Sequence, residues 1–249
     1  MTPKVSVVIP AYRSEATLDS SVRSALEQTV REIEVIVVDD GSDDGTADVL
    51  ARLAEEDARV RVITLAQNGG VANARNCGVK AARAPWTAFL DSDDVWVKDK
   101  LARQLAAAEQ TGTQLVYTAA SCIDADGKPT GRTFQVPEKV TYRSMLYGSD
   151  LICSTVLVRT ELLLRHPMER SELHEDYICW LRILKDGVRT AGIAEPTVLY
   201  RAARTSKSGD KKRSAAMTWR TYRYLGFGFF ARVRYFLGYC LHGVKRYWL

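Results

Sequence analysis

Val5-Ser6-Val7-Val8-Ile9-Pro10 is a near-continuous apolar run at the start of the chain. Such a run is typical of a strand that is buried on both faces of a parallel sheet. A helical pattern follows over residues 16–28, and a second strand-like run over residues 34–38 ends in Asp39-Asp40-Gly41-Ser42. This order of strand, helix and strand predicts an α/β unit whose first two strands are parallel.

The alternation continues through the first half of the chain. Further helices are predicted over residues 46–56, with Thr46 as the N-cap, over 71–82 and over 97–111, and further strands over 59–65, 86–90 and 115–119. A hairpin turn is predicted at 124–127, and a weaker pattern then indicates a strand at 156–158 and a helix at 176–185. Together these elements predict one Rossmann-like, mostly parallel sheet flanked by helices.

The composition is that of a soluble globular protein, with 46% apolar and 26% charged residues in a chain of 249. No apolar run reaches the roughly 18 residues of a membrane-spanning helix, and no signal segment precedes Val5. Five scattered cysteines form no CxxC pair, which favours free thiols in a reducing compartment. These features predict a cytoplasmic location.

The charge is unevenly distributed along the chain. Residues 201–249 contain twelve Lys or Arg against one acid, a net charge of +11, whereas residues 1–200 contain 23 basic and 29 acidic residues, a net charge of −6. A basic tail on a mildly acidic body predicts that the tail contacts an anionic partner.

Polar and acidic residues follow three of the predicted strands. Tyr12 comes after the first, Asp39 and Asp40 after the second, and Asp91 and Asp93 after the fourth. Ligands of open α/β sheets collect at the carboxyl ends of the strands, and clustered carboxylates there favour a hard divalent cation, Mg²⁺ or Mn²⁺. Each group alone is also explained by a turn, a cap or packing, so the prediction depends on their shared position.

Several segments together resemble glycosyltransferase family 2. They are Val5 to Tyr12, Val37-Val38-Asp39-Asp40-Gly41-Ser42-Asp43-Asp44-Gly45-Thr46, Asn68-Gly69-Gly70 with Ala74-Arg75-Asn76, and Phe89-Leu90-Asp91-Ser92-Asp93-Asp94. The resemblance covers roughly residues 4–201. It implies a glycosyltransferase-A fold and a nucleotide diphosphate sugar as the donor, most often a uridine diphosphate (UDP) sugar.

The resemblance also implies where the nucleotide binds. Pro10, Ala11 and Tyr12 would border the base, with Tyr12 stacked on it. Asp40 would accept a hydrogen bond from the uracil edge, with Asp39 beside it.

Further along the chain, the resemblance implies residues for the sugar phosphate and the metal. Arg75 would line the nucleotide pocket. Asp91 would contact the ribose or the metal shell, with Ser92 beside it, and Asp93 would be the most direct metal ligand. Asp94 would only cap the segment that follows.

His174-Glu175-Asp176 precedes a helical apolar pattern. Acidic residues are common in the first turn of a helix, where they suit the helix dipole. The pair also resembles the base motif of the family, which implies that Asp176 removes the proton of the acceptor hydroxyl, with Glu175 as the second candidate. His174 is interpreted as a surface residue.

Tyr200-Arg201, followed by Ser206 and Ser208, resembles a loop that closes over the diphosphate in this family. Many relatives have a His there, whereas this chain has Ala202-Ala203-Arg204. Arg201, Arg204 or Lys207 could neutralise the departing phosphates, and a merely solvated loop over residues 202–214 is the alternative.

The tail combines aromatic and basic residues. Residues 219–249 contain eleven of the chain's twenty-two aromatic residues, interleaved with Arg and Lys. Phe229, Val233, Phe236, Cys240 and Val244 recur at helical spacing. This pattern predicts a helix at a membrane surface, with packing onto the body as the second interpretation and nucleic-acid binding a distant third.

The predicted organisation is a catalytic domain over residues 1–201 and a loop with an amphipathic tail over 202–249. The predicted function is inverting, metal-dependent transfer of a sugar to a saccharide acceptor by an enzyme on the inner face of the cell membrane. A link of this acceptor to polyprenyl diphosphate would suit the basic, aromatic tail. The alternatives are a nucleotidyltransferase and a non-catalytic module that binds membranes or polyanions.

Overall fold

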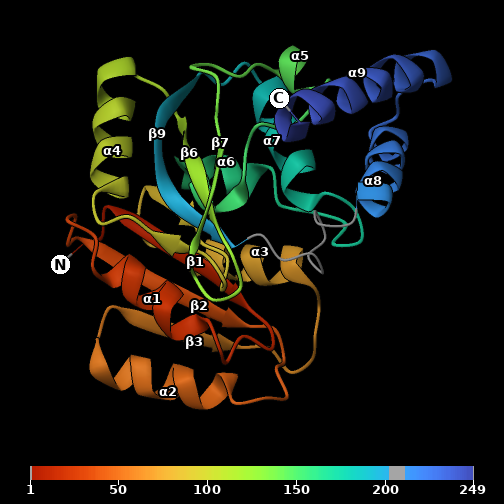
Figure 1. The fold of residues 1–249 in the computed structure, drawn as a ribbon. Helices are drawn as coiled ribbons and strands as arrows, with labels where there is room; N and C mark the ends of the chain where they lie inside the picture. Colours follow the sequence, from red (N-terminus) through yellow and green to blue (C-terminus); the bar gives the residue numbers. More distant parts are fainter. Residues whose placement is uncertain (1, 202–210, 249) are drawn as a thin grey trace.

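The computed structural model describes residues 2–201 and 211–248, and within them it has one nine-stranded sheet (Figure 1). The strand order is β3-β2-β1-β4-β8-β6-β9-β5, and β7 pairs with β6 off this path. The strands are β1 (Val5–Ala11), β2 (Ile33–Asp39), β3 (Val60–Thr64), β4 (Trp86–Phe89), β5 (Val95–Trp96), β6 (Leu115–Ile123), β7 (Pro129–Phe134), β8 (Leu157–Arg159) and β9 (Thr190–Arg201).

The sheet is mixed but mostly parallel. Strands β3, β2, β1 and β4 run parallel to one another, as do β6 and β9, and most paired residues lie in these parallel pairs. Strand β8 lies antiparallel between β4 and β6, and β5 and β7 are antiparallel to their partners. The predicted fold class is therefore confirmed.

Helices cover both faces of this sheet, as the apolar pattern of β1 requires. Val5, Val7 and Ile9 lie in a cluster with residues of α1, α2 and α4, whereas Val8 lies in a second cluster with residues of α3, α6 and α7. Both sets are fully buried, as expected for a central parallel strand. The helices are α1 (Leu18–Leu26), α2 (Thr46–Glu56), α3 (Val71–Ala81), α4 (Lys100–Thr111), α5 (Tyr142–Met145), α6 (Thr160–Arg165), α7 (Glu175–Lys185), α8 (Lys211–Tyr224) and α9 (Phe229–Trp248), with a short 3-10 helix at Cys153–Thr155.

Three sequence predictions about these elements were wrong. Thr46 is the first residue of α2 rather than its N-cap, and its Oγ1 accepts the Ser14 N–H at 2.9 Å. The predicted helix over 97–111 begins only at Lys100, because residues 95–96 form β5 with β9. Residues 211–214 of the predicted loop belong to α8, and residues 202–210 lie outside the described part of the chain.

The tail forms two helices that lie together at one side of the molecule, away from α1 and α2 (Figure 1). Tyr222 of α8 is fully buried, and its hydroxyl donates to the Leu146 carbonyl oxygen at 2.9 Å. Part of the predicted tail therefore belongs to the same core as α7. No helix within the described ranges is long and apolar enough to cross a membrane.

A buried carboxylate ties the first strands together at the end of the sheet remote from the acidic loops. Glu34 accepts hydrogen bonds from the Ser6 hydroxyl and the Arg83 N–H, both at 2.7 Å, and pairs with Arg61 at 2.5 Å. Burial acts to raise the pKa of Glu34, but these bonds together hold the pKa below its usual value. The ionised form is therefore the one that stabilises the fold.

Replacement of Glu34 by Gln should lower the free energy of unfolding at pH 7 by about 1.5–3 kcal/mol, because it removes charge-assisted bonds. A lowered folded pKa contributes stability above the unfolded pKa that is lost as the pH falls through the folded pKa. The difference from wild type should therefore shrink in acid, as measured by urea unfolding at several pH values. The exposed Glu55→Gln is the control, and a difference that stays constant with pH would contradict this account.

Candidate active site

The loops after β1, β2 and β4 meet at the carboxyl edge of the parallel strands, as predicted. Pro10 and Ala11 are buried in β1, whereas the Tyr12 side chain directly after them is 41% exposed. Arg13 follows with a positive φ of 50°, and it pairs with Asp43 of the next loop at 2.6 Å. Tyr12 is thus partly open to solvent, with the Arg13 guanidinium 5.2 Å from the centre of its ring, and stacking of this ring on a base stays a prediction.

The two acids at the end of β2, Asp39 in the strand and Asp40 directly after it, are buried and hold loops in place. Asp39 accepts from both the N–H and the hydroxyl of Ser42 at 3.0 and 2.6 Å. The Asp40 oxygens accept the N–H groups of Gly69 and Gly70, each at 2.8 Å. Gly70 has φ +85°, and a Cβ there would lie 2.7 Å from Ser171 Oγ, so the loop needs glycine at this position. Contact of Asp39 and Asp40 with a base stays a prediction.

The segment Asp91-Ser92-Asp93 contacts the loop that follows β1. Ser92 Oγ is 2.8 Å from Ser14 Oγ, which ties this segment to the loop after β1. One oxygen of Asp91 accepts a hydrogen bond from Arg75 Nη2 at 2.6 Å. Burial, followed by the neighbouring charge of Asp91, raises the pKa of Asp93 to about 6.

Arg75 of α3 connects this segment to the start of α7. Its guanidinium donates to Asp91 at 2.6 Å and to Glu175 at 2.9 Å, and the residue is only 4% exposed. The next residue, Asn76, makes a pair of bonds with the Met168 backbone at 2.7 and 3.0 Å. Arg75 therefore lies beneath the carboxylates as their shared counter-ion, and its contact with a nucleotide stays a prediction.

The two acids at the start of α7 have different environments. Glu175 is buried and paired with Arg75, whereas Asp176 is partly exposed. Burial and the adjacent Glu175 raise the pKa of Asp176. Asp176 is thus the better placed of the two to accept a proton from a bound molecule. His174, interpreted from the sequence as a surface residue, is half-buried and its Nε2 lies 3.2 Å from the Ser214 carbonyl oxygen of α8.

Arg201 at the end of β9 is held by main-chain oxygens. Its side chain donates to the carbonyls of Asp93 at 2.9 Å, Asp124 at 2.9 Å and Ala125 at 2.7 Å, and its N–H donates to Asp94 at 2.9 Å. These bonds fix the Asp93 loop against the hairpin between β6 and β7. Contact of Arg201 with a phosphate stays a prediction, and Arg204 and Lys207 lie outside the described residues.

Sequence reasoning missed Ser154 and the partners of Asp94, two residues that support the loop after β4. Asp94 was expected to cap the following segment, but it is fully buried and accepts the Ser154 hydroxyl at 2.6 Å. Ser154 Oγ in turn accepts the Asp91 N–H at 3.0 Å. No sequence spacing relates residue 154 to residues 91–94, because their contact arises only where β8 is inserted beside β4.

The carboxylate pair suits a divalent cation. Asp91 and Asp93 lie close enough to raise the pKa of Asp93, and a cation would remove this repulsion. One Asp91 oxygen is already paired with Arg75, which leaves Asp93 as the more available ligand. No group of three or more His, Cys, Asp or Glu that could hold a metal occurs in the described ranges, so phosphate oxygens would have to complete the shell.

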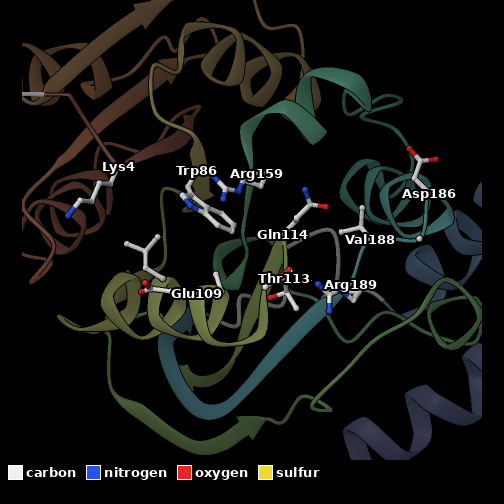
Figure 2. Close-up of a pocket in the computed structure, with 13 residues that line it drawn as sticks. Lys4, Trp86, Glu109, Thr113, Gln114, Arg159, Asp186, Val188 and Arg189 are labelled. Carbon is white, nitrogen blue, oxygen red and sulfur yellow. Dashed lines mark hydrogen bonds between the residues drawn. The ribbon is translucent and has the colours of Figure 1, made fainter.

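A cavity of about 800 Å³ lies at the opposite edge of the sheet (Figure 2). Its residues include Lys4, Trp86, Gln114 and Arg189, which stand at the amino ends of β1, β4, β6 and β9. Arg159 lies over the Trp86 ring at 4.2 Å. The acidic residues of the predicted site are all absent from its lining, so this cavity is separate from the candidate active site.

The Asp93 carboxyl should titrate near pH 6 in the free protein. Replacement of Asp91 by Asn should lower the pKa of Asp93, because it removes a neighbouring negative charge, but should leave it above the ordinary value of about 3.9 because burial remains. Carbon-13 NMR of the side-chain carboxyl carbons measures this, with the exposed Asp48→Asn as control. An unchanged Asp93 titration in Asp91→Asn would contradict the assigned cause.

Comparison with known sequences gives relatives of matching length. The chain is 34% identical over 245 residues to a putative teichuronic acid biosynthesis glycosyltransferase, TuaG, of Bacillus subtilis, with 98% of this chain and 97% of the relative covered. It is 32% identical to WfgD of Escherichia coli, a UDP-Glc:alpha-D-GlcNAc-diphosphoundecaprenol beta-1,3-glucosyltransferase, with 98% and 94% covered.

Solved structures show the same fold. TarS 1-349 of S. aureus in complex with UDP-GlcNAc matches with a TM-score of 0.72 and 22% identity, over 89% of this chain and 65% of that one. The mannosyltransferase PcManGT of Pyrobaculum calidifontis, in complex with GDP-Man and Mn²⁺, matches with a TM-score of 0.70 and 19% identity, over 92% and 66%. The family model for glycosyl transferase family 2 matches residues 6–163. The chain therefore belongs to glycosyltransferase family 2.

Proposed function

We propose that this glycosyltransferase moves a sugar from a UDP-sugar to a hydroxyl of a saccharide carried on polyprenyl diphosphate, with inversion at the anomeric carbon. The observation that carries the proposal is the position of the buried Arg75 guanidinium. It holds Asp91, on the donor side, and Glu175, next to the candidate base Asp176. Family membership favours this reaction over nucleotidyl transfer and over a non-catalytic binding module.

The donor site is proposed at the loops after β1, β2 and β4. The exposed Tyr12 ring stacks on the base, and the buried Asp39 and Asp40 hold the surrounding loops in the shape that the base needs. Support comes from a fold neighbour, because the TarS structure contains UDP-GlcNAc.

Asp93 and the Asp91 oxygen that does not contact Arg75 would hold Mn²⁺ or Mg²⁺ together with the diphosphate. Such a cation supplies stabilisation of the negative charge that develops on the leaving group. Arg75 keeps Asp91 oriented, and Arg201 holds the Asp93 main chain, so both carboxylates are positioned before the donor arrives. A fold neighbour was solved with Mn²⁺, which supports this choice of metal.

Asp176 is proposed as the general base. Its raised pKa brings it closer to neutral pH, where a base of this kind works best. It removes the proton of the acceptor hydroxyl as that oxygen attacks the anomeric carbon, and UDP departs from the opposite side. An α-linked donor then gives a β-linked product, in agreement with the beta-1,3 linkage in the name of the E. coli relative.

The acceptor is proposed from the relatives. The name of WfgD specifies a diphosphoundecaprenol-linked acceptor, and that of TuaG specifies teichuronic acid biosynthesis. A lipid-linked saccharide also suits the basic, aromatic tail. The enzyme would then act in cell-surface polysaccharide assembly, on the inner face of the cell membrane.

UDP should bind wild-type protein more tightly with Mn²⁺ than with a chelator, as measured by isothermal titration calorimetry. Asp93→Ala should weaken binding in Mn²⁺ by at least about tenfold, because it removes the main metal ligand. Asp48→Ala, on the outer surface of α2, should bind like wild type. Equal affinity in Mn²⁺ and chelator for the wild type would overturn the proposed metal role.

Asp176→Asn should lower kcat by about 10²–10⁴-fold and leave the UDP affinity unchanged, because only the base is lost. The assay uses UDP-glucose and a lipid diphosphate that carries N-acetylglucosamine, the substrates in the name of the E. coli relative. The exposed Glu172→Gln, four residues earlier, is the matched control. Full activity of Asp176→Asn, or an α-linked product from the wild type by proton NMR, would contradict the mechanism.

A further inference from the structure

One face of helix α9 (Phe229–Trp248) packs against the protein. Its other face is not covered by any part of the chain that the structure describes. On the inner face, the Tyr235 and Tyr147 rings lie 5.3 Å apart, and His242 pairs with Asp150 at 2.8 Å. A Cβ at Gly238 would lie 2.3 Å from the Tyr147 ring, so the helix packs closely at this point. These contacts fix the rotation of α9 about its own axis.

The outer face of α9 is apolar. Phe230 is 86% exposed, Leu237 59%, Leu241 73% and Val244 54%. Their spacing of seven, four and three residues places them on one side of the helix, about a third of a turn around its axis from Tyr235, Gly238 and His242. Contiguous exposed apolar surface of this kind marks an interaction site rather than an ordinary protein surface.

The surroundings of this face are basic. Residues 211–249 contain nine Lys or Arg and no Asp or Glu. Arg234 is exposed and lies one turn before Leu237, with its guanidinium 5.8 Å from the centre of the Tyr147 ring. No ion pair of Arg220, Arg223 or Arg234 occurs within residues 2–201 and 211–248. A second copy that docked through the same face would bring two strongly positive segments together, whereas an anionic surface would be attracted.

We propose that the outer face of α9 lies in the surface of an anionic lipid membrane, with Phe230, Leu237, Leu241 and Val244 among the acyl chains. Phe230 and Val244 are fourteen residues apart, or about 21 Å along the helix, so α9 lies along the membrane surface and does not cross it. The proposal uses only the surface of α8 and α9 and does not rest on the proposed reaction.

The test is flotation of the full chain with vesicles of phosphatidylcholine, alone and mixed with phosphatidylglycerol. Wild type should float with the mixed vesicles and much less with phosphatidylcholine alone. Leu237→Glu/Leu241→Glu should weaken binding by at least about tenfold, because it removes two inserted side chains and adds negative charge. Arg234→Gln should weaken binding to the anionic vesicles by about fivefold and leave the neutral vesicles unaffected.

The matched control is Leu164→Glu on α6. Leu164 is 55% exposed, close to the value for Leu237, but it lies outside α9. It should float like wild type.

All four α9 residues are exposed, so thermal melts of the variants should coincide with that of the wild type. Phe230→Ser provides a second variant of the face. UDP titration reports on the proposed function separately, because a chain that binds vesicles without binding UDP would contradict only the reaction.

Two results would overturn the proposal. The first is a wild type that ignores both kinds of vesicle, or a Leu237→Glu/Leu241→Glu variant that binds them as well as the wild type. The second is a wild-type dimer by light scattering that this variant converts to a monomer without any change in vesicle binding. In that case the face is an interface between copies of this chain.

Discussion

The site depends on the burial of one guanidinium between two carboxylates from distant parts of the chain. Arg75 is paired with the half-buried Asp91 and with the buried Glu175, and the Glu175 carboxylate would not be stable in so buried a place without it. Loss of one partner from such a buried pair is costly, because the remaining charge is left uncompensated. The same pairs also fix the distance between the loop that follows β4 and the start of α7. Arg75 is therefore a structural requirement of the site as well as a source of positive charge beside its carboxylates.

Within residues 2–201 and 211–248, the acids around Arg75 outnumber the cations that face them, and the pKa shifts follow from burial first and from this imbalance second. Burial and the neighbouring acids raise the pKa of Asp93, Asp94 and Asp176. Both carboxyl oxygens of Asp94 accept hydrogen bonds within the protein, one from the Ser154 hydroxyl and one from the Arg201 N–H. Asp93 and Asp176 are more open and have fewer such bonds. These two carboxyls can therefore respond to a bound cation and to a bound hydroxyl, which are the two ligands that the proposed reaction requires.

Much of the sheet and the positions of the acidic loops could be predicted from the sequence, because the apolar run of β1 and the acids after β2 and β4 are local signals. The family resemblance placed Arg75 in the site, but not its bond to Glu175, a hundred residues away. That bond depends on how α7 packs against α3, and no local pattern encodes this packing. Ser154 was missed for the same reason. The tail was predicted as one amphipathic helix, whereas a break after Tyr224 lets α8 enter the core and leaves α9 at the surface.

The position of α8 connects the proposed membrane face to the proposed base. The His174 ring, directly before Glu175, lies 3.2 Å from the Ser214 carbonyl oxygen of α8, and Trp219 of α8 packs edge-on against Phe236 of α9 at 5.5 Å. A lipid-linked saccharide presents its hydroxyl at a limited height above the membrane. An α9 that lies on the membrane would therefore hold the start of α7 at a fixed height too, through packed side chains rather than a flexible linker. Membrane binding would then raise the effective concentration of the acceptor at Asp176 and also restrict its orientation.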